Sequence, residues 1–276
     1  MPSPVQLPLF QIDAFEEGPF TGNPAAVVPL EEPLEDDLMQ RIAEENNLSE
    51  TAFTAPIPGA DTAAPSFALR WFTPTTEVDL CGHATLAAAA ALRDMGALQG
   101  ASQVHFSTRS GPLVAHLEGS EEVSIDLPAA LPEAAPGQEQ LGAIERALDA
   151  PIESVFLHRY ALAILPSEDD VRGLSPREDL LRSAGIPIIA TAPADADDVH
   201  FVSRFFAPTL GVLEDPVTGS AHCQLVPYWA ARFGARELVA RQVSTRGGRL
   251  RCRLDDDRVQ LAGGARIYLR GTIEVG

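Results

Sequence analysis

The chain has 276 residues, of which 45% are hydrophobic and 21% are charged, as in a globular protein with a substantial core. Its 39 acidic residues outnumber the 20 Lys and Arg and give a formal net charge of −19. This charge argues against nucleic acid or an anionic membrane as a partner, because both are bound through basic patches. Neither a signal peptide nor a membrane span is expected, and the three unpaired cysteines are typical of a reduced, cytoplasmic protein.

Alternating and helical patterns divide the first half of the chain into short elements. Strands are predicted at residues 9–15, 25–28, 67–72, 104–107, 113–117 and 123–127, and helices at 36–46 and 84–92. Residues 128–136 are rich in Pro and Ala and are predicted to be a linker. The expected domains are therefore 1–128 and 129–276.

The second half repeats this organisation. Helices are predicted at residues 141–148, 177–184 and 221–233, and strands at 155–165, 186–191, 199–206, 239–244, 249–254, 258–261 and 266–275. Gly263-Gly264 and Arg270-Gly271 are interpreted as turns between the last strands. Arg249, Arg251 and Arg253 alternate with apolar residues, which predicts the solvent face of an antiparallel strand.

Two segments about half a chain length apart look like copies of one another. Arg70-Trp71-Phe72-Thr73-Pro74 precedes Gly82, and Arg204-Phe205-Phe206-Ala207-Pro208 precedes Gly219; each glycine opens an apolar helix. We interpret them as a duplication in which the second copy carries three extra residues just before its glycine. Helix N-termini have unpaired N–H groups and a positive dipole end, so the repeat predicts a site for a small anionic metabolite.

Several side chains beside these segments could act on such a ligand. Glu50 lies among apolar residues, where partial desolvation would suit a general acid or base, although a surface glutamate is the simpler interpretation. His83 is expected at a first helical turn, where the dipole favours the neutral ring. Asp215 falls in the insertion and could equally start a turn, and Thr218 and Ser220 could be ordinary helix caps.

Cys81 offers an alternative, because a thiol at a helix N-terminus can become a base. A racemase with two thiols needs a second sulfur, yet aligning the two glycines places Thr218 opposite Cys81, and Cys223 lies one turn deeper. We therefore disfavour this mechanism. No Cys/His spacing predicts a metal, and no glycine pattern predicts a nucleotide, so neither metal nor cofactor is expected.

Motifs throughout the chain resemble the phenazine-biosynthesis PhzF-like family, which has the diaminopimelate-epimerase-like fold. The matching blocks are residues 11–15, 20–27, 47–53, 69–74, 77–87 and 214–222, followed by Gln242, Ser244 and 246–248. The resemblance implies an α/β (α+β) fold of two similar domains, each a curved, mostly antiparallel sheet around a central helix. It also implies that the last strand, near 265–276, can return to the first domain, and that the protein is a homodimer that uses neither metal nor organic cofactor.

The resemblance further implies an isomerase in which one glutamate carries a proton between two carbons of an unsaturated carboxylate. The residues that match catalytic positions are Glu50, His83 and Asp215, and those that match substrate-binding positions are Ser49, Gly82, Thr218, Gly219 and Ser220. Two alternatives stay open: an amino or hydroxy acid epimerase that uses Cys81, and a homologue that binds a metabolite or protein without catalysis.

Overall fold

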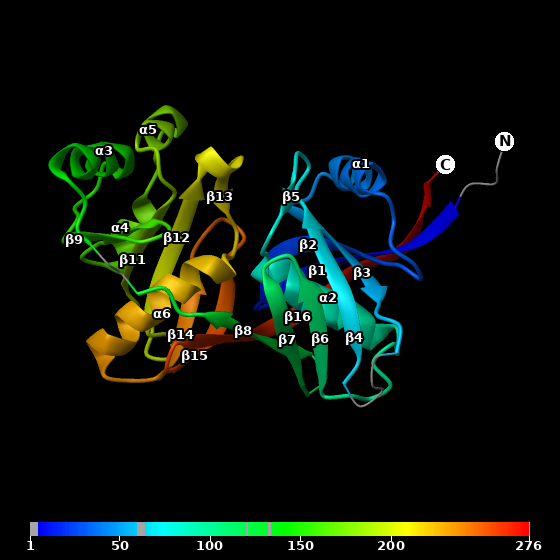
Figure 1. Ribbon diagram of the computed structural model, residues 1–276. Coiled ribbons are helices and arrows are strands. Elements are labelled where there is room, and N and C mark those ends of the chain that lie inside the picture. Colours follow the sequence, from blue (N-terminus) through cyan, green and yellow to red (C-terminus); the bar gives the residue numbers. More distant parts are fainter. Residues whose placement is uncertain (1–4, 60–63, 120, 132–133, 276) are drawn as a thin grey trace. The chain divides into compact units, whose positions relative to one another are not determined.

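The computed structural model describes residues 5–59, 64–119, 121–131 and 134–275, and the chain divides into two compact units (Figure 1). Unit 1 comprises Met1–Asp126 together with Ala262–Gly276, and unit 2 comprises Leu127–Leu261. Residues 132–133 of the predicted linker lie outside the described residues. That 1–128 and 129–276 behave as separate domains stays a prediction.

Unit 1 is a mixed sheet wrapped around one helix. Its strands run in the order β1-β2-β3-β4-β6-β7-β8, with β5 beside β4. Among the pairs of these described strands, β2–β3 and β4–β6 are parallel and the others are antiparallel. The elements are β1 (Val5–Glu16), β2 (Asn23–Pro29), α1 (Asp36–Asn46), β3 (Glu50–Pro56), β4 (Ser66–Phe72), β5 (Glu77–Val78), α2 (Gly82–Asp94), β6 (Gln103–Thr108), β7 (Gly111–Glu118) and β8 (Glu122–Pro128).

Helix α2 is the central element of unit 1 and packs against β1, β2, β3 and β7. Every residue from Gly82 to Leu92 is buried. Five consecutive alanines, at 87–91, favour the helix and keep its surface small enough for strands to approach it closely. A helix that is apolar on all sides is stable only when it is enclosed. Among the described helices, none has both the length and the apolar character that a bilayer crossing requires.

Unit 2 has the same strand order and the same two parallel positions. Its strands run β9-β10-β11-β12-β14-β15-β16, with β13 beside β12, and the β10–β11 and β12–β14 pairs are parallel. The elements are α3 (Gln138–Leu148), β9 (Ser154–Leu157), β10 (Ala161–Ile164), α4 (Glu168–Gly173), α5 (Glu178–Ser183), β11 (Ile188–Pro193), β12 (Phe201–Ala207), the 3₁₀ turn η1 (Pro208–Leu210), β13 (Val212–Asp215), α6 (Gly219–Phe233), β14 (Glu237–Gln242), β15 (Gly248–Asp255) and β16 (Arg258–Val275).

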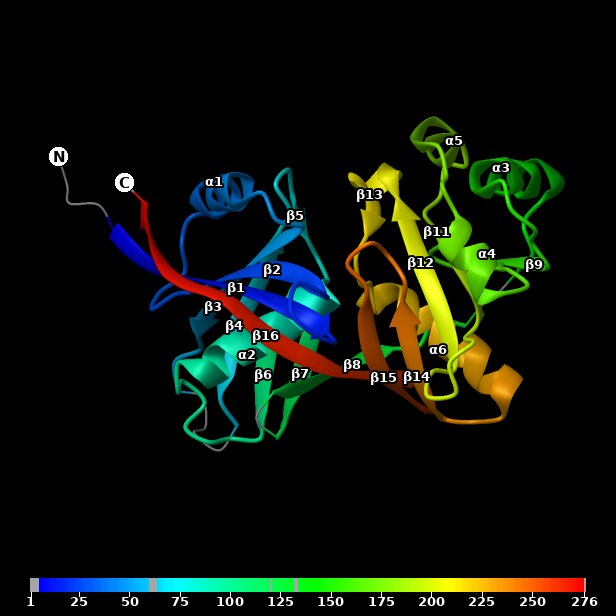
Figure 2. The same ribbon diagram turned by 180° about the vertical axis from the view of Figure 1, so that it is seen from behind.

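Helix α6 corresponds to α2 and packs on β14 and β15, while α4 covers β11 and β12 (Figure 2). Trp229 of α6 is fully buried between the rings of Phe201 and Phe233 and donates to Thr191 Oγ1 at 3.0 Å. The matching strand orders and central helices agree with the predicted α/β class of two similar, sheet-rich halves. The arginines of β15 alternate with buried residues, so the predicted solvent face is confirmed.

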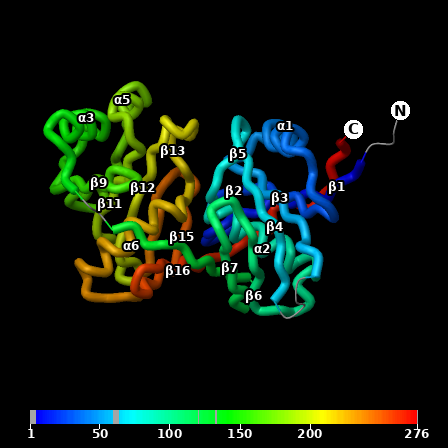
Figure 3. Tube along the Cα trace, viewed as in Figure 1, coloured from blue at the N-terminus to red at the C-terminus, as the bar shows by residue number. Residues whose placement is uncertain are grey.

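Strand β16 corrects the prediction of two separate final strands. It runs through both Gly263-Gly264 and Arg270-Gly271, which are therefore not turns, and pairs antiparallel with β1 (Figure 3). A Cβ on Gly264 would lie 2.8 Å from Glu16 Oε1 and 3.0 Å from the Glu16 carbonyl oxygen. The glycine is thus required by the close approach of two strands, which sequence patterns do not distinguish from a turn.

The structure bears out the internal repeat and relocates its insertion. Arg70 makes paired contacts with Glu77 at 2.7 and 2.8 Å, and Arg204 makes the same pair with Glu214. From each glutamate to the glycine that begins the helix the spacing is equal, so the three extra residues lie between Pro208 and Glu214, where the chain forms the end of the η1 turn and the start of β13. Asp215 is consequently not inserted: it occupies the register of Val78.

Gly22 should be intolerant of a side chain. Its φ is +82°, and a Cβ would lie 2.6 Å from the Ala14 carbonyl oxygen. We expect Gly22→Ala to lower the free energy of unfolding by about 1–3 kcal/mol, through backbone strain and this collision. Urea denaturation measures the change, with Gly173→Ala as control, because no atom lies within 4 Å of a Cβ there. Equal stabilities of the two variants would contradict the prediction.

Candidate active site

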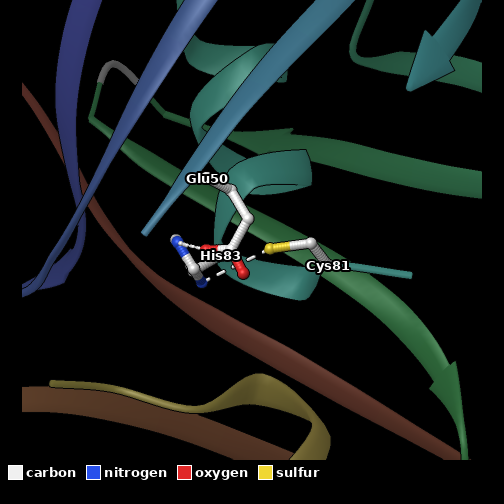
Figure 4. Close-up of side chains that lie close together, drawn as sticks. All are labelled: Glu50, Cys81 and His83. Atoms are coloured by element: carbon white, nitrogen blue, oxygen red, sulfur yellow. Dashed lines mark hydrogen bonds and ion pairs between the residues drawn. The ribbon is translucent and has the colours of Figure 1, made fainter. Parts of the chain in front are cut away.

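Three polar side chains meet beside the start of α2 in unit 1 (Figure 4). Glu50 is the first residue of β3, Cys81 is the N-cap of α2, and His83 is the second residue of that helix. His83 Nε2 lies 3.1 Å from Glu50 Oε2, and Cys81 Sγ lies 3.5 Å from His83 Nδ1. The Glu50 side chain is 18% exposed and that of His83 is 6% exposed, so the pair is largely shielded yet reachable.

Asn23 and Ser49 orient the histidine ring. Ser49 Oγ donates to Asn23 Oδ1 at 3.1 Å, which leaves the Asn23 amide nitrogen to donate to His83 Nδ1 at 3.2 Å. With Nδ1 as acceptor, the neutral ring carries its proton on Nε2, the nitrogen beside Glu50. Asn23 is fully buried and was not predicted as a site residue. Its position between Gly22 and Pro24 predicts a turn, so the sequence pattern gives no indication that Asn23 contacts the histidine.

The charge of Glu50 opposes the effect of the helix dipole on His83. Burial lowers the pKa of His83, but the adjacent Cys81 sulfur and Glu50 carboxylate raise it, so that it lies well above its ordinary value. The helix dipole alone favours the neutral ring. It is outweighed because a carboxylate lies within 3.1 Å, and a full charge at that distance is the stronger influence. In the protonated ring Nδ1 also donates, which requires Asn23 to turn its amide.

Cys81 should be an unreactive thiol. Burial and the nearby Glu50 carboxylate raise its pKa, which outweighs the effect of the helix N-terminus. We expect iodoacetamide at neutral pH to label Cys81 much more slowly than a free cysteine, as followed by mass spectrometry. Because the folded pKa is raised, labelling should stay slow through the usual thiol range and accelerate only at higher pH. In urea all three cysteines should react, and rapid labelling of folded Cys81 would instead favour the epimerase alternative.

The predicted residues of unit 2 gather at the start of α6. Thr218 is the N-cap, but its hydroxyl donates to Asp215 Oδ2 rather than accepting from the helix. Ser220 Oγ lies 3.0 Å from the Tyr160 hydroxyl. Neither α2 nor α6, both in the described part of the chain, has a side-chain cap at its N-terminus. The first-turn N–H groups that begin with Gly219 are therefore suited to an anion.

Two residues that sequence reasoning did not assign to the site hold this loop in place. Gln242 Oε1 accepts from the Thr218 backbone N–H at 2.9 Å, and Gln242 Nε2 donates to the Asp215 carbonyl at 2.6 Å. Ser244 Oγ donates to the Pro216 carbonyl at 2.8 Å. Gln242 and Ser244 are among the positions that carry the family resemblance, and that match is the sequence signal that could have identified them as site residues. The site residues thus form two groups: Ser49, Glu50, Gly82 and His83 in unit 1, and the 215–220 group in unit 2.

Comparison with known proteins identifies the family. The sequence pattern of the phenazine biosynthesis-like protein family, PhzC-PhzF, matches residues 12–271, nearly the whole chain. The chain belongs to the PhzF family. An uncharacterised isomerase of Pseudomonas aeruginosa is 45% identical over 273 residues, which cover 98% of this chain and 100% of that protein. The resemblance noted from the sequence motifs is confirmed.

Solved PhzF structures agree with the fold. The crystal structure of a PhzF-family protein from Enterococcus faecalis superposes with a TM-score of 0.90 at 42% identity, covering 98% of this chain and 99% of the other. A predicted epimerase from Pseudomonas aeruginosa gives a TM-score of 0.72 at 23% identity, which extends the likeness to the epimerase fold. The predictions of the fold class and of an isomerase are thus confirmed at the level of this PhzF family.

Proposed function

We propose that the protein is a cofactor-independent isomerase that shifts a proton on a small, unsaturated, carboxylate-bearing metabolite, with Glu50 as its single acid and base. The observation that carries the proposal is the close approach of the Glu50 carboxylate and His83 Nε2, 3.1 Å apart in a largely buried setting. A carboxylate held beside a proton-bearing ring, and shielded from bulk water, suits reversible proton transfer.

In the proposed reaction, Glu50 takes a proton from a carbon adjacent to the unsaturated system. The electron pair of that C–H bond forms a new double bond to the neighbouring carbon. The electrons of the original double bond move to its far carbon, which becomes nucleophilic. Glu50, now a neutral carboxylic acid, returns the proton there, so no atom or electron is gained or lost. One residue suffices because the conjugate acid of the base is the acid of the second step.

The remaining residues are proposed to hold the substrate. The uncapped helix N-termini at Gly82 and at Thr218-Gly219-Ser220 offer N–H groups to a carboxylate. His83 and Asp215 would anchor polar groups and steady the charge that develops as the proton leaves. Ser49 would act through Asn23, whose amide it orients toward His83. Asp215 accepts a hydrogen bond from the Thr218 hydroxyl, and we propose that its carboxylate also accepts one from a substrate N–H or O–H.

A metabolite screen in heavy water tests the proposal. We expect a subset of unsaturated carboxylates to take up solvent deuterium at the new C–H position, whereas their methyl esters do not. Mass spectrometry detects the added deuterium, and NMR places it. Epimerisation of saturated amino or hydroxy acids would favour the Cys81 alternative. Binding without exchange would favour a non-catalytic homologue.

We also propose that the protein acts in the cytoplasm as a homodimer on a small anionic metabolite. The family resemblance supports the homodimer. A further support is an exposed apolar patch of unit 1, where Phe20 is 70% and Tyr268 57% exposed and their rings lie 6.3 Å apart. Exposed aromatic side chains are enriched where proteins associate. Analytical ultracentrifugation should therefore give twice the chain mass, and Phe20→Ser with Tyr268→Ser should shift it to the monomer.

A further inference from the structure

We propose that Glu50, Cys81 and His83 form a binding site for Zn²⁺, and that the bound ion inhibits the isomerase. These residues offer one oxygen, one sulfur and one nitrogen, and the three donor atoms lie within 4.8 Å of one another. Carboxylate, thiolate and imidazole are the ligand types that zinc prefers. Cys/His spacing alone did not predict this cluster, because Glu50 begins strand β3 whereas Cys81 and His83 lie at the start of helix α2.

The positions of the Glu50 carboxylate and the His83 ring support the binding of one ion by both side chains. Glu50 Oε2 and His83 Nε2 are 3.1 Å apart, and both atoms are buried. Two ligands of one tetrahedral zinc, with bonds of about 2.0–2.2 Å, lie about 3.4 Å apart. The observed separation is thus close to that of two atoms that bind one ion.

Cys81 would supply the third ligand. Its sulfur is 3.5 Å from His83 Nδ1, and one donor atom from each of the three residues lies within 4.8 Å of the other two. Rotation about the Cα–Cβ bond of Cys81 is the movement that would bring the sulfur to an ion at Nε2. The thiol proton passes to solvent when zinc binds, so that one carboxylate and one thiolate neutralise the two positive charges. Three protein ligands leave the fourth position to water.

Asn23 can accommodate either state of the ring. When zinc occupies the Nε2 lone pair, the ring proton must move to Nδ1, which then needs an acceptor. A turn of the buried Asn23 amide presents Oδ1 to Nδ1 at the place where its nitrogen now lies, 3.2 Å away. Such an outer partner orients most histidines that bind metals. Inhibition follows because the zinc ion occupies the Glu50 oxygen that would accept the substrate proton. The inhibition rests on the proposed function, whereas the binding of zinc does not.

Cadmium absorbance and zinc competition test the site in the full-length protein. In a Cys223→Ala, Cys252→Ala background Cys81 is the sole thiol, since the chain has three cysteines. We expect Cd²⁺ to produce a thiolate-to-metal charge-transfer band at one ion per chain. Zn²⁺ competition against a chromophoric chelator should show affinity about tenfold or more lower in Cys81→Ser and His83→Gln. Circular dichroism verifies that both variants fold.

The outcomes separate the two parts. Absence of the band, or unchanged zinc affinity in both variants, would overturn the site. Zinc binding with loss of deuterium exchange, reversed by a chelator, supports the whole proposal. Zinc binding without loss of exchange would support the site but overturn the inhibition, and it would also contradict Glu50 as the base. Exchange that is absent even without zinc, together with normal zinc binding, would overturn the proposed function alone.

Discussion

Glu50→Gln is expected to reduce deuterium uptake by the substrate about 10²–10⁴-fold, the usual contribution of a general acid or base. The amide has nearly the same shape as the carboxylate and can still contact His83, but it cannot accept the carbon-bound proton. The expected loss is therefore in the chemical step, with substrate affinity largely kept. Deuterium exchange under saturating and limiting substrate separates these two effects.

A matched control comes from α1, where Glu44→Gln changes an exposed carboxylate to which the proposed reaction gives no role. This variant should exchange at the wild-type rate. Glu50→Asp keeps the acid but withdraws it by one methylene, so we expect partial activity. If Glu50→Gln exchanges as fast as the wild type, Glu50 is not the base. If the three glutamate variants are folded and active and a fourth variant, Cys81→Ser, is folded but inactive, the result favours the epimerase alternative.

His222 is expected to make the protein lose stability as the pH falls. Its ring is fully buried beside Phe201, and burial lowers its pKa from 6.5 to about 4, although a hydrogen bond to the Thr218 carbonyl opposes this. Between these values the unfolded chain binds a proton that the folded chain does not, so unfolding becomes easier with falling pH. Since one pKa unit corresponds to about 1.4 kcal/mol, the loss from pH 7 to pH 4 is about 3 kcal/mol.

His222→Asn isolates this contribution. The asparagine amide nitrogen can replace Nδ1 as donor to the Thr218 carbonyl, at 2.8 Å in the wild type, but it does not titrate. Urea denaturation from pH 7 to pH 4 should therefore show a shallower decline for the variant, with most of the difference arising below pH 6.5. His158→Asn, at an exposed position, serves as control and should follow the wild type. Equal slopes for His222→Asn and the wild type would contradict the prediction.

Local patterns predicted much of the fold because they reflect local energetics. The amphipathic spacing of α1 and the apolar run of α2 each specify a helix, and the predicted and observed elements agree closely there. The short elements β5, β13, α4 and η1 were missed, since two to six residues are too few for a period to emerge. The seven-residue strand β3 was also missed, and β9 and β10 were predicted as one strand. The prediction of a turn at Gly263-Gly264 was wrong, because a glycine required by strand packing has the same sequence signal as a turn glycine.

The candidate site was predicted less completely than the fold. Motif positions indicated Glu50 and His83, and the structure brings them within 3.1 Å. Their roles stay proposals, as do those of Asp215 and the 218–220 group. Asn23 and Gln242 were missed because each acts across the fold, on a partner 60 and 24 residues away respectively. No local pattern in a single chain encodes such a pair.

The sequence by itself determined the acidic composition, the duplicated arginine–aromatic segments and the glycines at the starts of α2 and α6. These depend only on residue identity and short-range spacing. Only the tertiary structure decided that Asp215 lies outside the insertion, that β16 is continuous, and that Glu50 meets Cys81 and His83. The physical reason is that charge interactions and strand contacts depend on distance in space. The pKa of His83 is raised for that reason, against the expectation from its helix alone.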